Sequence, residues 1–165
     1  LPQVKSDLVL AEEHWGNVSC WNQFSPMTSK DLALKHISSF LNNEGPDEYD
    51  PDADTFVLQY SGHGAGGSGD WCMAENKRIS FDEILRLWNA SQGKRRGGLL
   101  MLVLDSCHSG KWVEEARKRN LQDVVVQAAC ASDSSSSQQP QECWSGCFLG
   151  RDPPEARHCS SLQKM

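Results

Sequence analysis

Three short, mostly apolar runs are the strongest structural signal in this sequence. They cover Thr55–Tyr60, Leu99–Leu104 and Val124–Ala129, and each has the length of a β-strand. Runs of this kind are typical of strands buried on both faces, as in a parallel sheet. A weaker β-rich run lies at Val18–Trp21. The sequence therefore predicts a mostly parallel sheet.

Segments with helical signals separate these runs. Thr28–Asp31 and Ser80–Glu83 have the residue spacing of a capping box, and apolar residues at helical spacing follow each box. Trp112–Arg119 and Leu8–His14 are two further helix candidates. Strands that alternate with helices predict an α/β fold with right-handed crossovers.

Composition excludes several classes of function. The chain has 165 residues, 38% of them hydrophobic, which is typical of one globular domain. A net charge of −6 argues against a nucleic-acid-binding surface. The longest apolar run, Leu99–Leu104, is far shorter than the roughly 20 residues of a membrane-spanning helix. We expect neither a nucleic acid nor a membrane as partner.

The seven cysteines have irregular spacing and an odd count, so they do not indicate a disulfide framework. We expect a reducing compartment and a cytoplasmic location. The two N-x-S tripeptides, at Asn17 and Asn89, are interpreted as chance matches to a glycosylation signal.

The character of the chain changes after Ala131. Ser134–Pro140 is a low-complexity stretch of serine and glutamine, and no periodicity follows it. We expect a structured domain over residues 1–131 and a low-complexity or disordered tail over residues 132–165. No strand-like run precedes Leu8–His14. The chain is therefore interpreted as a truncated one.

Two loops carry the candidate chemistry. His63 lies three residues past Tyr60, and Cys107 lies three residues past Leu104. If these runs form neighbouring parallel strands, both side chains emerge at the carboxyl edge of the sheet, where ligands bind in open α/β sheets. A thiol next to an imidazole is an activated nucleophile. The flanking glycines allow a close backbone approach and N–H groups aimed at an oxyanion.

The motifs YSGHG at Tyr60–Gly64 and DSCHSG at Asp105–Gly110 resemble the paired motifs of the metacaspases, which are caspase-like cysteine peptidases. The resemblance implies a three-layer caspase-like sandwich with a mostly parallel sheet. The first strand and the C-terminal part of that fold have no counterpart in this chain. The implied activity is that of a cysteine-type endopeptidase acting on protein or peptide substrates.

The resemblance also implies a role for each matching residue. Cys107 is the nucleophile and His63 the general acid/base, while the N–H groups of Gly64 and Cys107 form the oxyanion hole. Ser61 and Asp105 match positions that line the pocket for the substrate residue preceding the cleaved bond (P1). A carboxylate in that pocket favours Arg or Lys at P1. No cofactor is required, and calcium is a possible activator.

Other interpretations stay open beside this one. The chain could be a catalytically inactive caspase-like domain that regulates or binds a partner, or a redox sensor built on the same thiol. Self-association is undecided, although an exposed edge at Val124–Ala129 would favour pairing.

Several motifs are interpreted as decoys. The Gly62-x-Gly64-x-x-Gly67 pattern matches a dinucleotide fingerprint, but no helix signal follows it. Zinc ligation by His63, Cys107 and His108, or by the cluster from Cys143 to Cys159, lacks convincing further ligands. The acidic segment 47–54 is interpreted as a solvated loop rather than a calcium site. We expect no resident metal.

Overall fold

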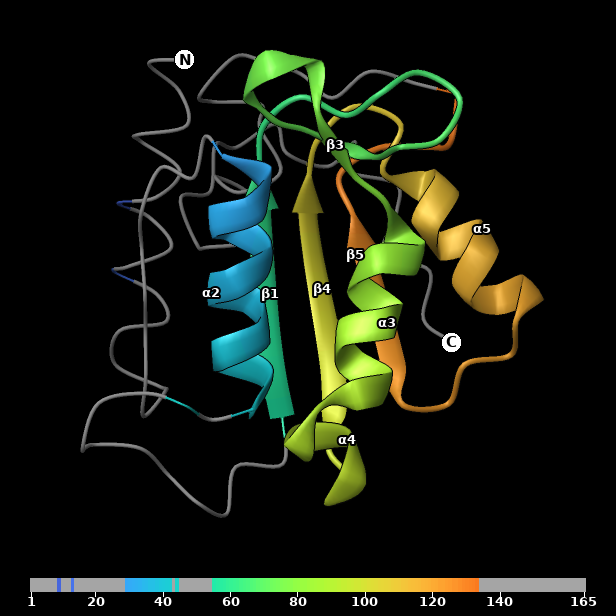
Figure 1. Ribbon diagram of the computed structural model, residues 1–165. Helices are drawn as coiled ribbons and strands as arrows, with labels where there is room; N and C mark the ends of the chain where they lie inside the picture. The colour runs from blue at the N-terminus through green and yellow to red at the C-terminus, as the bar shows by residue number, and fades with distance from the viewer. Residues whose placement is uncertain (1–8, 10–12, 14–28, 43, 45–54, 134–165) are drawn as a thin grey trace.

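The computed structural model describes residues 9, 13, 29–42, 44 and 55–133. Its main sheet has three parallel strands, β1 (Thr55–Ser61), β4 (Leu99–Asp105) and β5 (Val124–Ala128), in the order β1-β4-β5 (Figure 1). These strands are the three apolar runs, with ends that differ by a single residue. The prediction of an α/β fold with a mostly parallel sheet is confirmed.

Four helices accompany the sheet in this part of the chain: α2 (Lys30–Asn42), α3 (Phe81–Ala90), α4 (Gln92–Arg95) and α5 (Gly110–Lys118). Helices α2 and α3 lie over the same face of the sheet (Figure 1), and α5 contacts α3 through a ring contact between Trp112 and Phe81. The sheet and this helix layer are two of the layers expected of a caspase-like sandwich.

Capping explains where two helices begin. Ser80 Oγ accepts a hydrogen bond from Glu83 N at 3.3 Å, and Glu83 Oε2 accepts one from Ser80 N at 3.0 Å, so the predicted capping box of α3 is confirmed. Helix α2 begins at Lys30, and Ser29 Oγ lies 3.5 Å from Leu32 N. The predicted capping residue Thr28 lies outside the described residues.

Other predictions also fall outside the described part. They concern the strand at Val18–Trp21 and most of the helix at Leu8–His14, of which Val9 and Glu13 are described and helical. The domain boundary after residue 131 stays a prediction, since residues from 134 onward are not described.

A short hairpin between β1 and α3 was not anticipated. Its strands β2 (Trp71–Cys72) and β3 (Arg78–Ile79) are antiparallel, and the 3-10 turn η1 (Ala74–Asn76) connects them. The segment contains no α-helix, as the sequence predicts. The hairpin brings Trp71, which is 4% exposed, against the carboxyl edge of the sheet.

The core lies between the sheet and the helices. Strand register aligns Phe56 with Leu100, which is in turn aligned with Val124. Side chains alternate along a strand, so every second residue of each strand enters this layer. The Phe56 ring lies 5.7 Å from that of Phe40 in α2 and 5.6 Å from that of Trp88 in α3. Apolar burial therefore holds both helices to β1.

One polar link ties this core to the beginning of β5. Asp123 Oδ2 accepts a hydrogen bond from Trp88 Nε1 at 2.8 Å and lies 2.6 Å from Lys94 Nζ. Partial burial opposes ionisation of Asp123, but the hydrogen bonds from Lys94 and Trp88 outweigh it and lower the pKa of this carboxyl. The ionised carboxylate therefore stabilises the folded state.

Replacing Asp123 with asparagine should lower the free energy of unfolding by about 1 kcal/mol at pH 7, because the charge-assisted bond to Lys94 is lost. A folded-state pKa below the unfolded value contributes stability above the unfolded pKa of about 3.9, and this contribution is lost as the pH falls through the folded value. Urea unfolding at pH 7 and pH 3 should therefore give a difference between wild type and variant that shrinks at pH 3. An equal difference at both pH values would contradict the electrostatic explanation.

Candidate active site

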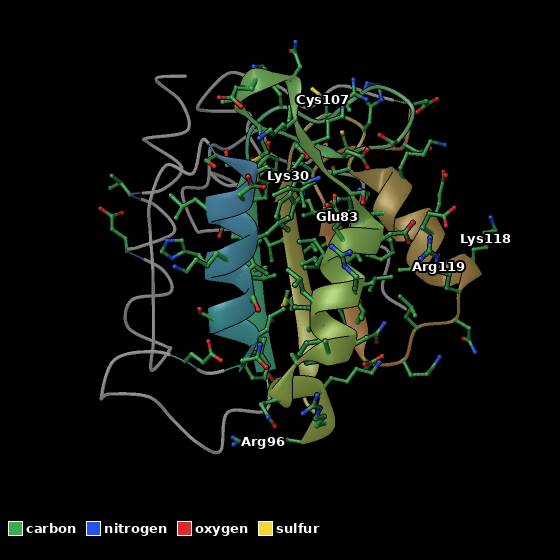
Figure 2. The ribbon with its side chains drawn as sticks, in the orientation of Figure 1. Lys30, Glu83, Arg96, Cys107, Lys118 and Arg119 are labelled. Carbon is green, nitrogen blue, oxygen red and sulfur yellow. The ribbon has the colours of Figure 1, made fainter. Side chains whose placement is uncertain are left out.

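The two motif loops leave neighbouring strands at the same edge. Ser61 at the end of β1 is the register partner of Asp105 at the end of β4, and Gly62 N donates a hydrogen bond to Asp105 O at 3.1 Å. His63 and Cys107 each lie two residues beyond this pair. Figure 2 shows Cys107 at the edge where the strand arrows end, and Arg96 at the opposite end of the molecule. The expected meeting of the loops at one edge is confirmed.

At Gly64 the backbone of one loop lies against the backbone of the other. A Cβ atom built on Gly64 would overlap the carbonyl oxygen of Cys107 and would lie 3.3 Å from Cys107 N. Backbone therefore packs directly on backbone here, which only glycine permits. Gly64, the second glycine of the YSGHG motif, thus allows the residue after His63 to pack against the backbone of Cys107.

The hairpin holds the other side of the His63 loop. Gly64 forms an antiparallel bridge with Trp71. Two hydrogen bonds make this bridge: Cys72 N donates to His63 O, and Ala65 N donates to Asp70 O, each at 2.9 Å. Both bonds use backbone groups of the residues on either side of Gly64, so the N–H of Gly64 itself is not part of the bridge. That N–H belongs to the peptide unit whose carbonyl is His63 O.

A tight turn holds Cys107 between β4 and α5. His108 has a φ of 57°, in the left-handed region, and its carbonyl accepts from Lys111 N at 3.0 Å. Gly110 N donates to Cys130 O at 3.0 Å, which ties the turn to the segment after β5. The thiol-bearing residue is half-buried, whereas His63 is exposed.

Polar side chains beneath this turn are buried. Ser106 and Ser109 are both 0% exposed. Cys130 Sγ donates to Ser106 O at 3.3 Å, next to the candidate nucleophile, and His108 Nδ1 lies 3.3 Å from Ser132 O. Sequence reasoning did not single out Cys130, since no motif spacing links it to the Cys107 loop.

An aromatic stack lies under the site and joins four elements. The ring centroids of Tyr60 and Trp71 are 4.5 Å apart, and those of Trp71 and Trp112 are 5.2 Å apart. Phe81 of α3 continues the stack at 5.2 Å from Trp112, and the Arg119 guanidinium lies 5.6 Å from the Phe81 ring. No pattern in the sequence predicts this stack.

Ser61 and Asp105 lie on the other face of the sheet. Their strand neighbours Tyr60 and Leu104 belong to the core on the helix face, so alternation directs Ser61 and Asp105 away from it. Asp105 is 6% exposed, and Ser61 is half-buried. The two residues predicted to line a specificity pocket are therefore adjacent, while their roles stay predictions.

The structure describes some of the motifs interpreted as decoys and leaves others untested. The chain after Gly67 enters the hairpin at Trp71 instead of a helix, so the glycine pattern lacks the helix N-terminus that a dinucleotide site needs. Across residues 29–42 and 55–133, no three His, Cys, Asp or Glu side chains gather closely enough to hold a metal ion. The acidic segment 47–54 and the cluster from Cys143 lie outside the described residues.

Comparison with known families agrees with this architecture. A family model of the caspase domain matches residues 21–149. Most of the chain is thus covered, and the chain belongs to the caspase domain family. Members of this family are cysteine peptidases in general. No solved structure matches the chain.

Curated relatives carry a different kind of name. Transmembrane protein 168 of Rattus norvegicus is 43% identical over 79 residues, which are 48% of this chain and 11% of that protein. The Homo sapiens protein of the same name is 39% identical over 79 residues, again 48% and 11%. Transmembrane protein 168-A of Danio rerio is 36% identical over 109 residues, which are 64% of this chain and 15% of that protein.

The chain therefore matches only 11% to 15% of the length of these relatives. In the part of the chain that the structure describes, every helix is too short or too polar to cross a lipid bilayer.

Proposed function

We propose that this chain is a cysteine-type endopeptidase that cleaves peptide bonds through a Cys107–His63 dyad, with a site nearest to that of the metacaspases. The observation that carries the proposal is the pairing of the two motifs at adjacent strand ends. Ser61 and Asp105 are register partners, and Gly64 lies against the carbonyl of Cys107. This pairing supports the proposal because the loops of the proposed nucleophile and base leave neighbouring strands at one edge of the sheet.

The proposed reaction has two steps. Cys107 Sγ attacks the substrate carbonyl while His63 takes up the thiol proton, and the N–H groups of Gly64 and Cys107 stabilise the oxyanion. The C–N bond breaks, and His63 transfers the proton to the leaving amine. Water, deprotonated by His63, then hydrolyses the thioester and releases the acid and the free thiol. No cofactor takes part.

The proposed specificity is for a cationic P1 side chain. Asp105 and Ser61 lie side by side at the carboxyl edge, on the face opposite the helix layer. A carboxylate that is 6% exposed there has a low-dielectric surrounding, which strengthens its attraction for Arg or Lys. A side chain with a negative charge would be repelled by the same group.

Cleavage of fluorogenic peptides with Arg, Lys, Asp or Asn at P1 tests both parts of this proposal, with and without calcium. Wild type should cleave after Arg and Lys, and Cys107→Ala should lose all cleavage because the nucleophile is gone. Asp105→Asn should reduce cleavage after Arg about tenfold or more, since a charge-assisted contact is lost. Cleavage after Asp would agree with the Cys107–His63 dyad but would refute the assignment of Asp105 and Ser61 to a pocket for a cationic P1 side chain.

A second function, a non-catalytic caspase-like domain that binds a partner, is favoured by one comparison. The curated relatives are named as transmembrane proteins, not as peptidases. Thiol reactivity separates the two functions. A working site should make Cys107 alkylate faster than the other cysteines, because the neighbouring imidazole activates it. A folded chain without cleavage, in which Cys107 reacts no faster than the other cysteines, would support the binding function.

A further inference from the structure

Tyr60 makes a contact that the reaction scheme above does not use. Its hydroxyl donates to His63 O at 3.0 Å and lies 3.3 Å from Cys72 O. The ring passes directly beneath the loop, because a Cβ atom on Gly62 would lie 2.6 Å from the Tyr60 hydroxyl oxygen. A side chain at position 62 would collide with Tyr60, so the tyrosine of the YSGHG motif fits in place because a glycine follows two residues later.

The carbonyl that Tyr60 contacts belongs to the peptide unit of Gly64 N–H. In a planar trans peptide, the C=O and N–H bonds point in opposite directions, and no cis peptide bond occurs in the described part of the chain. His63 O accepts from both the Tyr60 hydroxyl and Cys72 N, the latter at 2.9 Å. Two donors therefore fix the plane of this peptide and the direction of its N–H.

From this arrangement we infer that Tyr60 is a positioning residue that aims the N–H of Gly64 at the oxyanion, rather than one that acts on the His63 ring. The inference rests on the proposed peptidase function. Donors that are already aimed in the free enzyme stabilise a developing charge without reorganisation. A hydrogen bond to the carbonyl also polarises the peptide and strengthens its N–H as a donor.

The Tyr60 hydroxyl is itself held rigidly. Its ring stacks on Trp71 at 4.5 Å with an interplanar angle of 7°, and Trp71 stacks on Trp112. Burial, with a smaller contribution from nearby Cys72, raises the pKa of Tyr60 well above its usual range. The hydroxyl therefore keeps its proton, and its role as donor, at every pH at which a peptidase would work.

Tyr60→Phe removes the hydroxyl and keeps the ring in the stack. We expect kcat to fall about tenfold with little change in KM, less than the roughly 10²–10³-fold loss when an oxyanion donor is deleted. The inhibition constant of a peptide aldehyde, whose adduct oxygen occupies the oxyanion site, should weaken by the same factor. Alkylation of Cys107 by iodoacetamide forms no oxyanion, so its rate and pH profile should not change.

A matched control removes a buried hydroxyl elsewhere. Ser91 is 0% exposed, and its Oγ donates to Trp88 O at 2.7 Å at the C-terminal end of α3, far from the carboxyl edge of the sheet. Ser91→Ala should lower stability without changing kcat or aldehyde affinity. This control separates loss of a hydrogen bond in general from loss of the bond to His63 O.

Two outcomes would overturn the inference. Unchanged kcat and aldehyde affinity in Tyr60→Phe would show that the hydroxyl does not aim the donor. A parallel fall in the alkylation rate would show that Tyr60 acts on the thiol and imidazole instead.

Amide hydrogen exchange keeps this test separate from that of the peptidase function. Cys72 N donates to the same carbonyl, so its exchange should become several-fold faster in Tyr60→Phe and stay unchanged in Ser91→Ala. If wild type cleaves no peptide, the peptidase proposal fails. The catalytic part of the inference would fail with it, and Cys72 exchange would still test whether the Tyr60 hydroxyl orients the His63–Gly64 peptide. Faster exchange in Tyr60→Phe would support that orientation, and unchanged exchange would refute it.

Discussion

Replacing Gly64 with alanine should abolish peptide cleavage and lower the free energy of unfolding by about 3 kcal/mol. The new Cβ would overlap the carbonyl oxygen of Cys107. The loop cannot move away easily, since hydrogen bonds to Cys72 and Asp70 hold it on both sides of this residue. The overlap must therefore push the two candidate catalytic loops apart.

Urea unfolding followed by circular dichroism, together with cleavage of an Arg peptide, measures both effects of Gly64→Ala. Gly66→Ala is the matched control in the same loop, because its Cβ would meet only His108 Nε2, at 3.9 Å. That variant should stay within about 0.5 kcal/mol of wild type. If Gly64→Ala were as stable and as active as Gly66→Ala, the close packing of the loops would be refuted.

Replacing Trp112 with alanine should lower the free energy of unfolding by about 3–5 kcal/mol, the usual range for a large buried aromatic side chain. Trp112 is 0% exposed and packs between Trp71 and Phe81. Its loss would leave a cavity in the middle of the stack that joins α5 to the hairpin and to α3. The effect should thus reach the Cys107 turn, which immediately precedes α5.

Thermal and urea unfolding of Trp112→Ala beside Trp112→Phe would measure this contribution. The phenylalanine variant keeps a ring between the neighbours and should lose clearly less stability than the alanine variant. Because Trp112 Nε1 has no hydrogen-bond partner within the described structure, replacing the indole by a phenyl ring breaks no polar contact. Equal losses in the two variants would mean that the stack itself adds no stability.

Much of the site could be predicted from local sequence. Continuous apolar runs are typical of strands buried on both faces. Strand β4 is buried along most of its length, whereas β1 and β5 are mostly half-buried. Residues at equal offsets past two such runs must meet if the strands are parallel neighbours, and the pairing of Ser61 with Asp105 confirms this condition. The capping box at Ser80 was equally local, since its two hydrogen bonds span three residues.

The supporting structure could not be predicted in the same way. Strands β2 and β3 have two residues each, too few for any periodicity to show. Trp71 and Trp112 meet although they lie far apart in the chain, and the pattern around either residue does not indicate the other. The link from Asp123 to Trp88 and Lys94 is likewise a contact between distant segments.

Local patterns were enough to predict the α/β class, three of the strands, and the edge at which the His63 and Cys107 loops lie, because each of these depends on local periodicity or on a short motif. The contacts that hold this edge in place became clear only from the three-dimensional fold. Trp71 of the hairpin stacks on Tyr60 and on Trp112 of α5, and Gly64 lies against the backbone of Cys107. These contacts join segments that lie far apart in the chain, so no local pattern encodes them.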